Sequence, residues 1–191
     1  ILCAKISNSG KQNNPEFFYS STMHGDEVTG YVLMLRLIDY LLSNYDKNER
    51  IFNLINSVDI YINPNANPDG TYFESDTSIH GAKRYNANNV DLNRNFPDPF
   101  SQKSITLQPE NEAMINYMEN HNFVMSANIH GGAEIMNYPW DSYYSFDKRP
   151  TDSIWWANIS KQYVDSCRIY DSTLFSDTYY SGIIYGGDWY K

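Results

Sequence analysis

The sequence has few basic residues, few cysteines and no long apolar run. Lys and Arg total 14 against 23 Asp and Glu, which gives a formal net charge of −9. Nucleic acids and anionic membrane surfaces bind clustered positive charge, so neither is expected as a partner. No apolar stretch approaches the roughly 20 residues of a membrane-spanning helix. Two cysteines, Cys3 and Cys167, are too few for a disulfide framework or a cysteine metal cluster, and both a single bridge and two buried thiols remain open.

The residues that are abundant indicate a folded domain. Of the 191 residues, 41% are hydrophobic and 16% are aromatic, which suits one globular unit and excludes a disordered chain. Residues 1–6 have the composition of a strand already under way, and residues 186–191 end without a helix cap or a polar tail. We therefore expect a single domain over residues 1–191 that is incomplete at both ends.

Alternating strands and helices predict the fold class. Strand patterns cover residues 2–7, 17–23, 57–62 and 123–129, and helices are expected from Glu27 to about Ser43, from Pro109 to about Asn120 and over 153–166, with Asp152 as a cap. The first helix is expected to be buried through Val28, Tyr31, Val32, Leu35, Ile38 and Leu42. Residues 65–99 are mostly irregular, with a tight turn at Asn67–Gly70. The pattern predicts an α/β fold with a mixed, mostly parallel sheet and helices on both faces.

Polar side chains follow two of the predicted strands. His24 and Glu27 come after the strand at 17–23, and His130 comes after the strand at 123–129. Ligands gather at the carboxyl ends of strands in α/β sheets, and two imidazoles with one carboxylate are a ligand set of catalytic zinc. Taken singly, each feature has an ordinary explanation. A His followed three residues later by a Glu, as at His24 and Glu27, is common by chance, and His130 could be a turn residue before Gly131-Gly132.

The irregular segment contributes a second candidate group. Asp91, Asn93 and Arg94 lie within four residues, and Arg84 precedes Arg94 by ten. A planar guanidinium beside an amide suits capture of a carboxylate, and paired arginines near a metal suit oxyanion stabilisation. The alternative is a solvated loop with a surface salt bridge.

Together these residues resemble the zinc metallocarboxypeptidases, most closely the branch typified by carboxypeptidases N, E and D. The matching blocks occur in family order and span almost the whole chain. They are residues 23–27, 63–64 with 67–70, 90–97, 126–132 with 137–141, 182–184 and 188–190.

The resemblance implies a role for each position. His24, Glu27 and His130 match the ligands of one zinc ion, and Asp91 matches the acid that orients the first zinc histidine. Asn93 and Arg94 match the pair that grips the substrate's terminal carboxylate, and Arg84 matches the arginine that polarises the scissile carbonyl. Asp141 matches a pocket acid in members that remove Lys or Arg, although it could also be a turn residue after Pro139.

The implied function is removal of C-terminal residues, Lys or Arg above all, from peptides or proteins by metal-activated water. The family's general-base glutamate and a tyrosine belong after residues 188–190, so we expect this chain by itself to bind zinc and a carboxylate but to turn over poorly. Tyr185-Gly186-Gly187 departs from the family pattern at the pocket lining.

Three alternatives remain: a peptidoglycan amidopeptidase, an N-acyl amino acid deacylase, or a noncatalytic peptide-binding member. The resemblance also implies a secreted or periplasmic location. It implies nothing about the oligomeric state.

Overall fold

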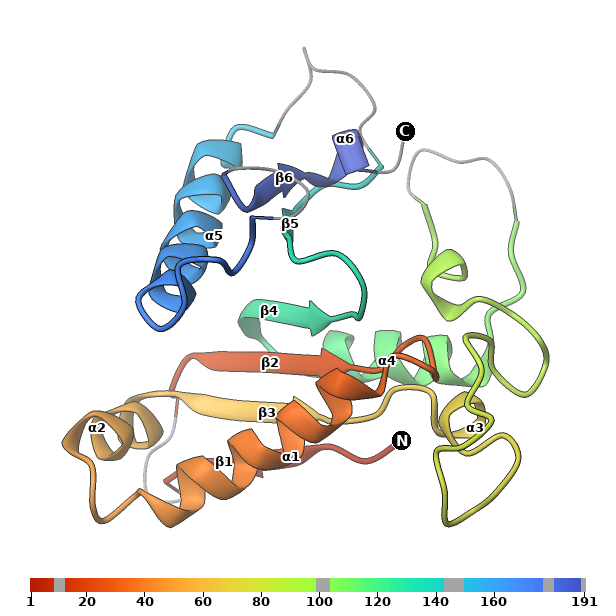
Figure 1. Cartoon of the computed structure of the whole chain (residues 1–191), viewed down its shortest axis with the longest axis horizontal. Coiled ribbons are helices and arrows are strands. Elements are labelled where there is room, and N and C mark those ends of the chain that lie inside the picture. Colours follow the sequence, from red (N-terminus) through yellow and green to blue (C-terminus); the bar gives the residue numbers. More distant parts are fainter. Residues whose placement is uncertain (9–12, 99–103, 143–149, 177–180, 190–191) are drawn as a thin grey trace. The chain divides into compact units, whose positions relative to one another are not determined.

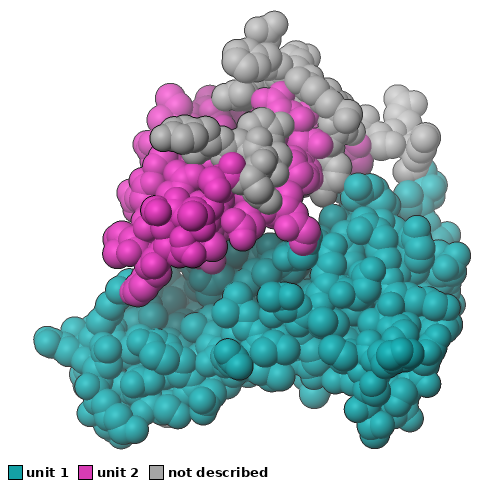
Figure 2. All heavy atoms as spheres, in the orientation of Figure 1, with its two compact units in different colours: residues 1–97, 104–131 teal, residues 98–103, 132–191 magenta. Residues whose placement is uncertain are grey.

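A computed structural model describes residues 1–8, 13–98, 104–142, 150–176 and 181–189. The residues fall into two compact units, coloured separately in Figure 2. Unit 1 contains residues 1–97 and 104–131, and unit 2 contains residues 98–103 and 132–191.

Unit 1 is built on a four-stranded sheet in the order β1-β3-β2-β4 (Figure 1). The strands are β1 (Ala4–Ile6), β2 (Glu16–Ser21), β3 (Asp59–Asn63) and β4 (Phe123–Ile129). β3 pairs antiparallel with β1 and parallel with β2, and β2 pairs parallel with β4. The predicted mixed, mostly parallel sheet is confirmed. The pairing of Ser21 with Ile129 sets the carboxyl ends of β2 and β4 side by side.

Helices cover both faces of this sheet, as predicted. On one face, α1 (Val28–Ser43) and α2 (Glu49–Ser57) pack Met34, Leu41, Ile51 and Ile55 against the isoleucines of β1 and β3. On the other face, α4 (Pro109–Glu119) packs Met114 with Phe18 of β2 and Tyr61 of β3. Successive β3 side chains therefore enter opposite cores, as the period of two in a strand requires.

The buried face of α1 differs from the prediction. Gly30, Met34 and Leu41 are buried, whereas Val32, Leu35 and Leu42 are 47–59% exposed. The helix is apolar on more than one side, so periodicity alone did not identify the side that faces the sheet. The side that carries Gly30 faces the sheet, and an added Cβ there would lie only 3.0 Å from the Ser21 Cβ, so the small glycine favours this close approach to β2.

The sequence analysis missed α2. This helix begins after Asn48, whose side chain accepts hydrogen bonds from the backbone N–H groups of Arg50 and Ile51. An Asn cap followed by apolar residues at Ile51 and Ile55, four positions apart, is a recognisable helix start and was the available signal.

The segment between β3 and α4 contains two short helical turns. α3 (Pro68–Thr71) replaces the predicted tight turn, and η1, a 3₁₀ turn, covers Leu92–Arg94. Pro68 stands at the start of α3, where its missing N–H costs nothing.

Unit 2 pairs β5 (Met136–Tyr138) with β6 (Ile183–Tyr185) in parallel and adds α5 (Ser153–Arg168) and α6 (Gly186–Trp189). Asp152 occupies the predicted N-cap position of α5, but its carboxylate accepts from the Trp156 indole and makes no capping bond to the backbone. Cys3 and Cys167 are free thiols, neither of them fully buried. Among the described helices none is both long and apolar enough to span a bilayer.

Candidate metal centre

The three predicted metal ligands lie at the carboxyl ends of β2 and β4. β2 ends at Ser21, and a turn with a positive φ at Thr22 leads to His24, whose carbonyl accepts from the Glu27 N–H at the start of α1. His130 directly follows β4. His24 is 4% exposed, and Met23 before it is anchored in the core. The adjacent ends of two parallel strands thus bring together residues that are 106 positions apart.

The ligand atoms of these three residues converge on one point. His24 Nδ1 and His130 Nδ1 are 3.2 Å apart, His24 Nδ1 is 2.8 Å from Glu27 Oε1, and His130 Nδ1 is 2.9 Å from Glu27 Oε2. A tetrahedral zinc with bonds of about 2.0–2.2 Å holds its ligand atoms roughly 3.3–3.5 Å apart. The observed set is therefore close to the required spacing, and the three residues could hold a metal ion.

The outer contacts fix which nitrogen of His24 faces inward. His24 Nε2 lies 3.2 Å from Asp91 Oδ1, so this contact orients the ring and directs Nδ1 toward Glu27 and His130. On the other side, the Gly131 N–H donates to Glu27 Oε2 over 2.9 Å. The sequence analysis gives Gly131 no role of its own. Its position directly after His130, a predicted metal ligand, was the available signal.

Hydrogen bonds keep the carboxylates of Glu27 and Asp91 ionised. Burial by itself would raise the pKa of Glu27, but hydrogen bonds from His130, His24 and the Gly131 N–H hold that pKa far below its usual range. Burial would likewise raise the pKa of Asp91, and the Arg84 guanidinium, His24 and the Asn93 N–H lower it instead. A metal ligand and its orienting acid both need the deprotonated form.

Arg84 lies beside the ligand atoms. Its Nε and Nη2 donate to Asp91 Oδ2 over 3.0 and 2.8 Å, while Nη1 is 3.3 Å from His24 Nδ1 and 3.9 Å from Glu27 Oε1. The side chain is 37% exposed. Asp91 therefore holds Nε and Nη2 of Arg84, while Nη1 lies beside the atoms of His24 and Glu27 that would bind the metal.

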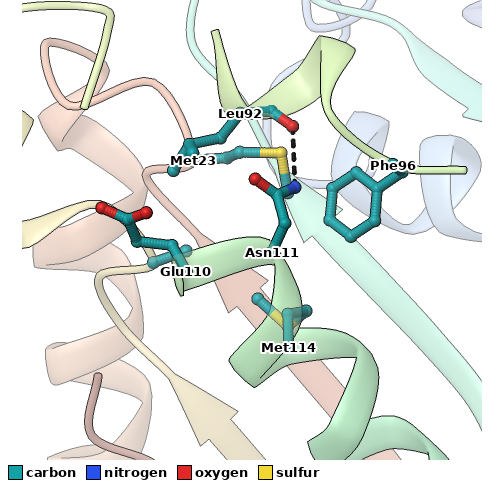
Figure 3. A pocket seen from close by; sticks show the side chains of 7 residues that line it. Met23, Leu92, Phe96, Glu110, Asn111 and Met114 are labelled. Atoms are coloured by element: carbon teal, nitrogen blue, oxygen red, sulfur yellow. Dashed lines mark hydrogen bonds between the residues drawn. The ribbon is translucent and has the colours of Figure 1, made fainter. Parts of the chain in front are cut away.

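Asn93 and Arg94 follow Asp91 in η1. Asp91 Oδ1 accepts from the Asn93 N–H over 2.9 Å, and Arg94 is exposed, with Nη1 donating to the Asn93 carbonyl. The Leu92 carbonyl accepts from buried Asn111 of α4, the bond dashed in Figure 3, and Leu92 lines a small pocket with Met23. The core thus anchors both the turn that carries His24 and the turn that carries Asp91. Asp141, the predicted pocket acid, belongs to unit 2.

Asp91 gives a direct test of this arrangement. Replacing Asp91 by Asn removes the charge that holds both His24 Nε2 and Arg84, so we expect the zinc affinity to fall by about 10–100-fold. Competition with a coloured chelator measures this affinity, with exposed Asp69→Asn as the control. Equal affinities in the two variants would show that Asp91 does not orient the ligand.

Comparison with known proteins identifies the family. The model of the family described as zinc carboxypeptidase matches residues 1–191. The chain belongs to this family. Zinc is the family's metal, and the donor set of His24, Glu27 and His130 fits it.

Individual relatives support this family assignment. The chain is 47% identical over 129 residues to carboxypeptidase M of Mus musculus, covering 67% of this chain and 29% of the relative. It is 37% identical over 188 residues to carboxypeptidase D of Anas platyrhynchos, covering 93% of this chain and 14% of the relative. A crystal structure of thrombin activatable fibrinolysis inhibitor shares the fold, with a TM-score of 0.82 at 16% identity over 97% of this chain and 50% of that one. The chain thus spans less than a third of the length of these two curated relatives.

Proposed function

We propose that this chain is the metal-binding part of a zinc-dependent metallocarboxypeptidase that removes single residues from peptide C-termini, with a preference for Lys and Arg. The observation that carries the proposal is the convergence of His24 Nδ1, Glu27 and His130 Nδ1, with the Arg84 guanidinium beside them. Bound zinc would supply a water of lowered pKa and a Lewis acid for the scissile carbonyl.

The roles of this chain's residues follow from their positions. His24, Glu27 and His130 would hold the metal, and Asp91 would keep the His24 ring in its tautomer. Arg84 would stabilise negative charge on the carbonyl oxygen through Nη1, because its other two nitrogens, Nε and Nη2, donate to Asp91. Asn93 and Arg94 would bind the terminal carboxylate, which limits cleavage to the last peptide bond.

The preference for basic residues rests on Asp141. In unit 2, its Oδ1 lies so close to Gly186 that a Cβ at Gly186 would be 1.8 Å away, and Asn137 Oδ1 would be 3.1 Å from the same Cβ. Two side-chain oxygen acceptors thus lie close to Gly186. Such a group suits an ammonium or guanidinium. The Gly-Gly sequence that departs from the family pattern leaves the space for these oxygens.

Calorimetric titration of the zinc-loaded chain with short peptides tests the function. A peptide ending in Arg with a free carboxylate should bind, and the same peptide with an amidated end should bind at least about 10-fold more weakly, as expected for a charge-assisted hydrogen bond of roughly 1.5–3 kcal/mol. Arg94→Ala should erase this difference. Asp141→Asn should erase a preference for Arg over Ala at the last position.

The opposite results separate the rival functions. Equal binding of free and amidated ends would contradict a carboxypeptidase site. Binding of cell-wall peptides or N-acyl amino acids in place of ordinary peptides would favour the amidopeptidase or the deacylase. The secreted or periplasmic location is part of the proposal and rests on the family resemblance. Fractionation of the source cells tests it, and recovery of the protein in the cytosol would contradict it.

A further inference from the structure

The turn that carries His24 contacts two other segments in a junction without spare space. Residues 23–25, 67–71 and 83–85 meet through their backbones. The Gly25 N–H donates to the Arg84 carbonyl over 3.3 Å, and the Lys83 N–H donates to the Gly70 carbonyl over 2.8 Å. A Cβ on Gly25 would lie 2.4 Å from the Gly70 carbonyl carbon and 2.5 Å from the Lys83 oxygen. The three segments are therefore in direct backbone contact.

One side chain, that of Asn67, bridges all three segments. Asn67 is fully buried. Its Nδ2 donates to the Met23 carbonyl over 3.1 Å and to the Arg84 carbonyl over 3.3 Å, and its Oδ1 accepts from the Gly70 N–H over 2.9 Å. Two of its partners can only accept and one can only donate, so the orientation of the amide is fixed. Both hydrogens of the amide nitrogen are used.

These bonds bear directly on His24. Asn67 holds the carbonyl of Met23, the residue before His24, and the Arg84 carbonyl holds the N–H of Gly25, the residue after it. The same Arg84 carbonyl accepts from Asn67. The peptide unit before the first metal ligand is thus connected to the Arg84 carbonyl through Asn67, and the peptide unit after it is bonded to that carbonyl directly. The side chain of Arg84 in turn reaches Asp91 and His24.

We propose that Asn67 is a positioning residue of the metal centre: its carboxamide sets the place of His24 relative to Arg84 and thereby the affinity and geometry of the bound metal. This inference rests on the proposed zinc site. The alternative is that Asn67 only caps α3, a role that its Oδ1 bond to Gly70 would satisfy without the two bonds from Nδ2.

Substitutions that keep a cap separate the two roles. Serine and aspartate both cap helices well. Asn67→Ser retains an oxygen for the Gly70 N–H but is too short to reach both carbonyls, and Asn67→Asp keeps the shape but places an oxygen against the two carbonyl oxygens. A stability control is Ile55→Ala, which removes buried side-chain atoms from the core under α2, away from the junction.

The experiment measures zinc affinity by chelator competition and the visible absorption spectrum of the Co²⁺-substituted chain, at a temperature where circular dichroism shows each variant folded. We expect Asn67→Ser to bind zinc about 10-fold or more weakly, as for other residues that orient metal ligands, and to change the cobalt spectrum. Ile55→Ala should leave the zinc affinity and the cobalt spectrum unchanged, even if its melting temperature falls by as much as that of Asn67→Ser. Asn67→Asp repeats the test if the serine variant does not fold.

The outcomes distinguish this inference from the function on which it rests. Normal zinc affinity and an unchanged cobalt spectrum in folded Asn67→Ser would overturn the positioning role and leave the zinc site intact. Equal losses in Asn67→Ser and Ile55→Ala would also overturn it, since general destabilisation would then account for both. Failure of the parent chain itself to bind zinc would overturn the metal site and the inference together.

Discussion

Replacing His24 by alanine is expected to lower the zinc affinity about 100–1,000-fold. Structural zinc sites with four protein ligands bind with apparent free energies of about 10–16 kcal/mol, so one protein ligand contributes roughly 2.5–4 kcal/mol, and 1.4 kcal/mol corresponds to a tenfold change. His24 is also the ligand whose second nitrogen is held by Asp91, so its removal leaves that acid and Arg84 without their common partner.

Chelator competition measures the loss, and His80→Ala is the matched control. His80 is a histidine of the same unit whose side chain is 91% exposed, and its one ion pair, with Glu74, is long at 3.8 Å. Its variant should bind zinc as the parent does. A folded His24→Ala variant within tenfold of the parent would mean that the metal lies elsewhere.

Replacing Gly25 by alanine is expected to destabilise unit 1 by about 3 kcal/mol or more, the upper end of the cost of overpacking. The added Cβ would lie within 2.5 Å of three backbone atoms, which belong to Gly70, Thr71 and Lys83. Backbone atoms cannot turn aside as the end of a long side chain can, so the junction has to open. Urea denaturation followed by circular dichroism measures the change.

Gly132→Ala provides the contrast. Gly132 has a φ of +104°, and no heavy atom lies within 4 Å of an added Cβ, so this variant has backbone strain without a clash. We expect it to lose less stability than Gly25→Ala, on the order of 1–2 kcal/mol. A loss at Gly25 no larger than that at Gly132 would contradict the close backbone approach as the reason for glycine at position 25.

The sequence predicted most of what places the metal centre. Apolar strand runs that end in His24 and His130 predicted parallel neighbours with adjacent carboxyl ends, and the register of Ser21 with Ile129 bears this out. The three-residue spacing of His24 and Glu27 predicted that both could face one point, which the 2.8 Å separation between them satisfies. These predictions held because they depend on local pattern and on a general property of α/β sheets.

Other features depend on contacts that no local pattern encodes. The exposed face of α1 could not be distinguished from its buried face, because close approach at Gly30 favours the observed orientation. The Asn67 bridge was also missed, since a sequence of the type Asn-Pro-Asp-Gly signals a turn wherever it occurs. Its two long-range bonds to residues 23 and 84 exist only after the three segments meet.

The most direct test of the central claim is the zinc content per chain after exhaustive dialysis, measured by plasma mass spectrometry on the parent and on His130→Ala. The arrangement of His24, Glu27 and His130 predicts close to one zinc per parent chain and little in the variant, because one of three converging ligands is gone. A folded parent without zinc, or equal zinc in both proteins, would contradict the proposed metal centre.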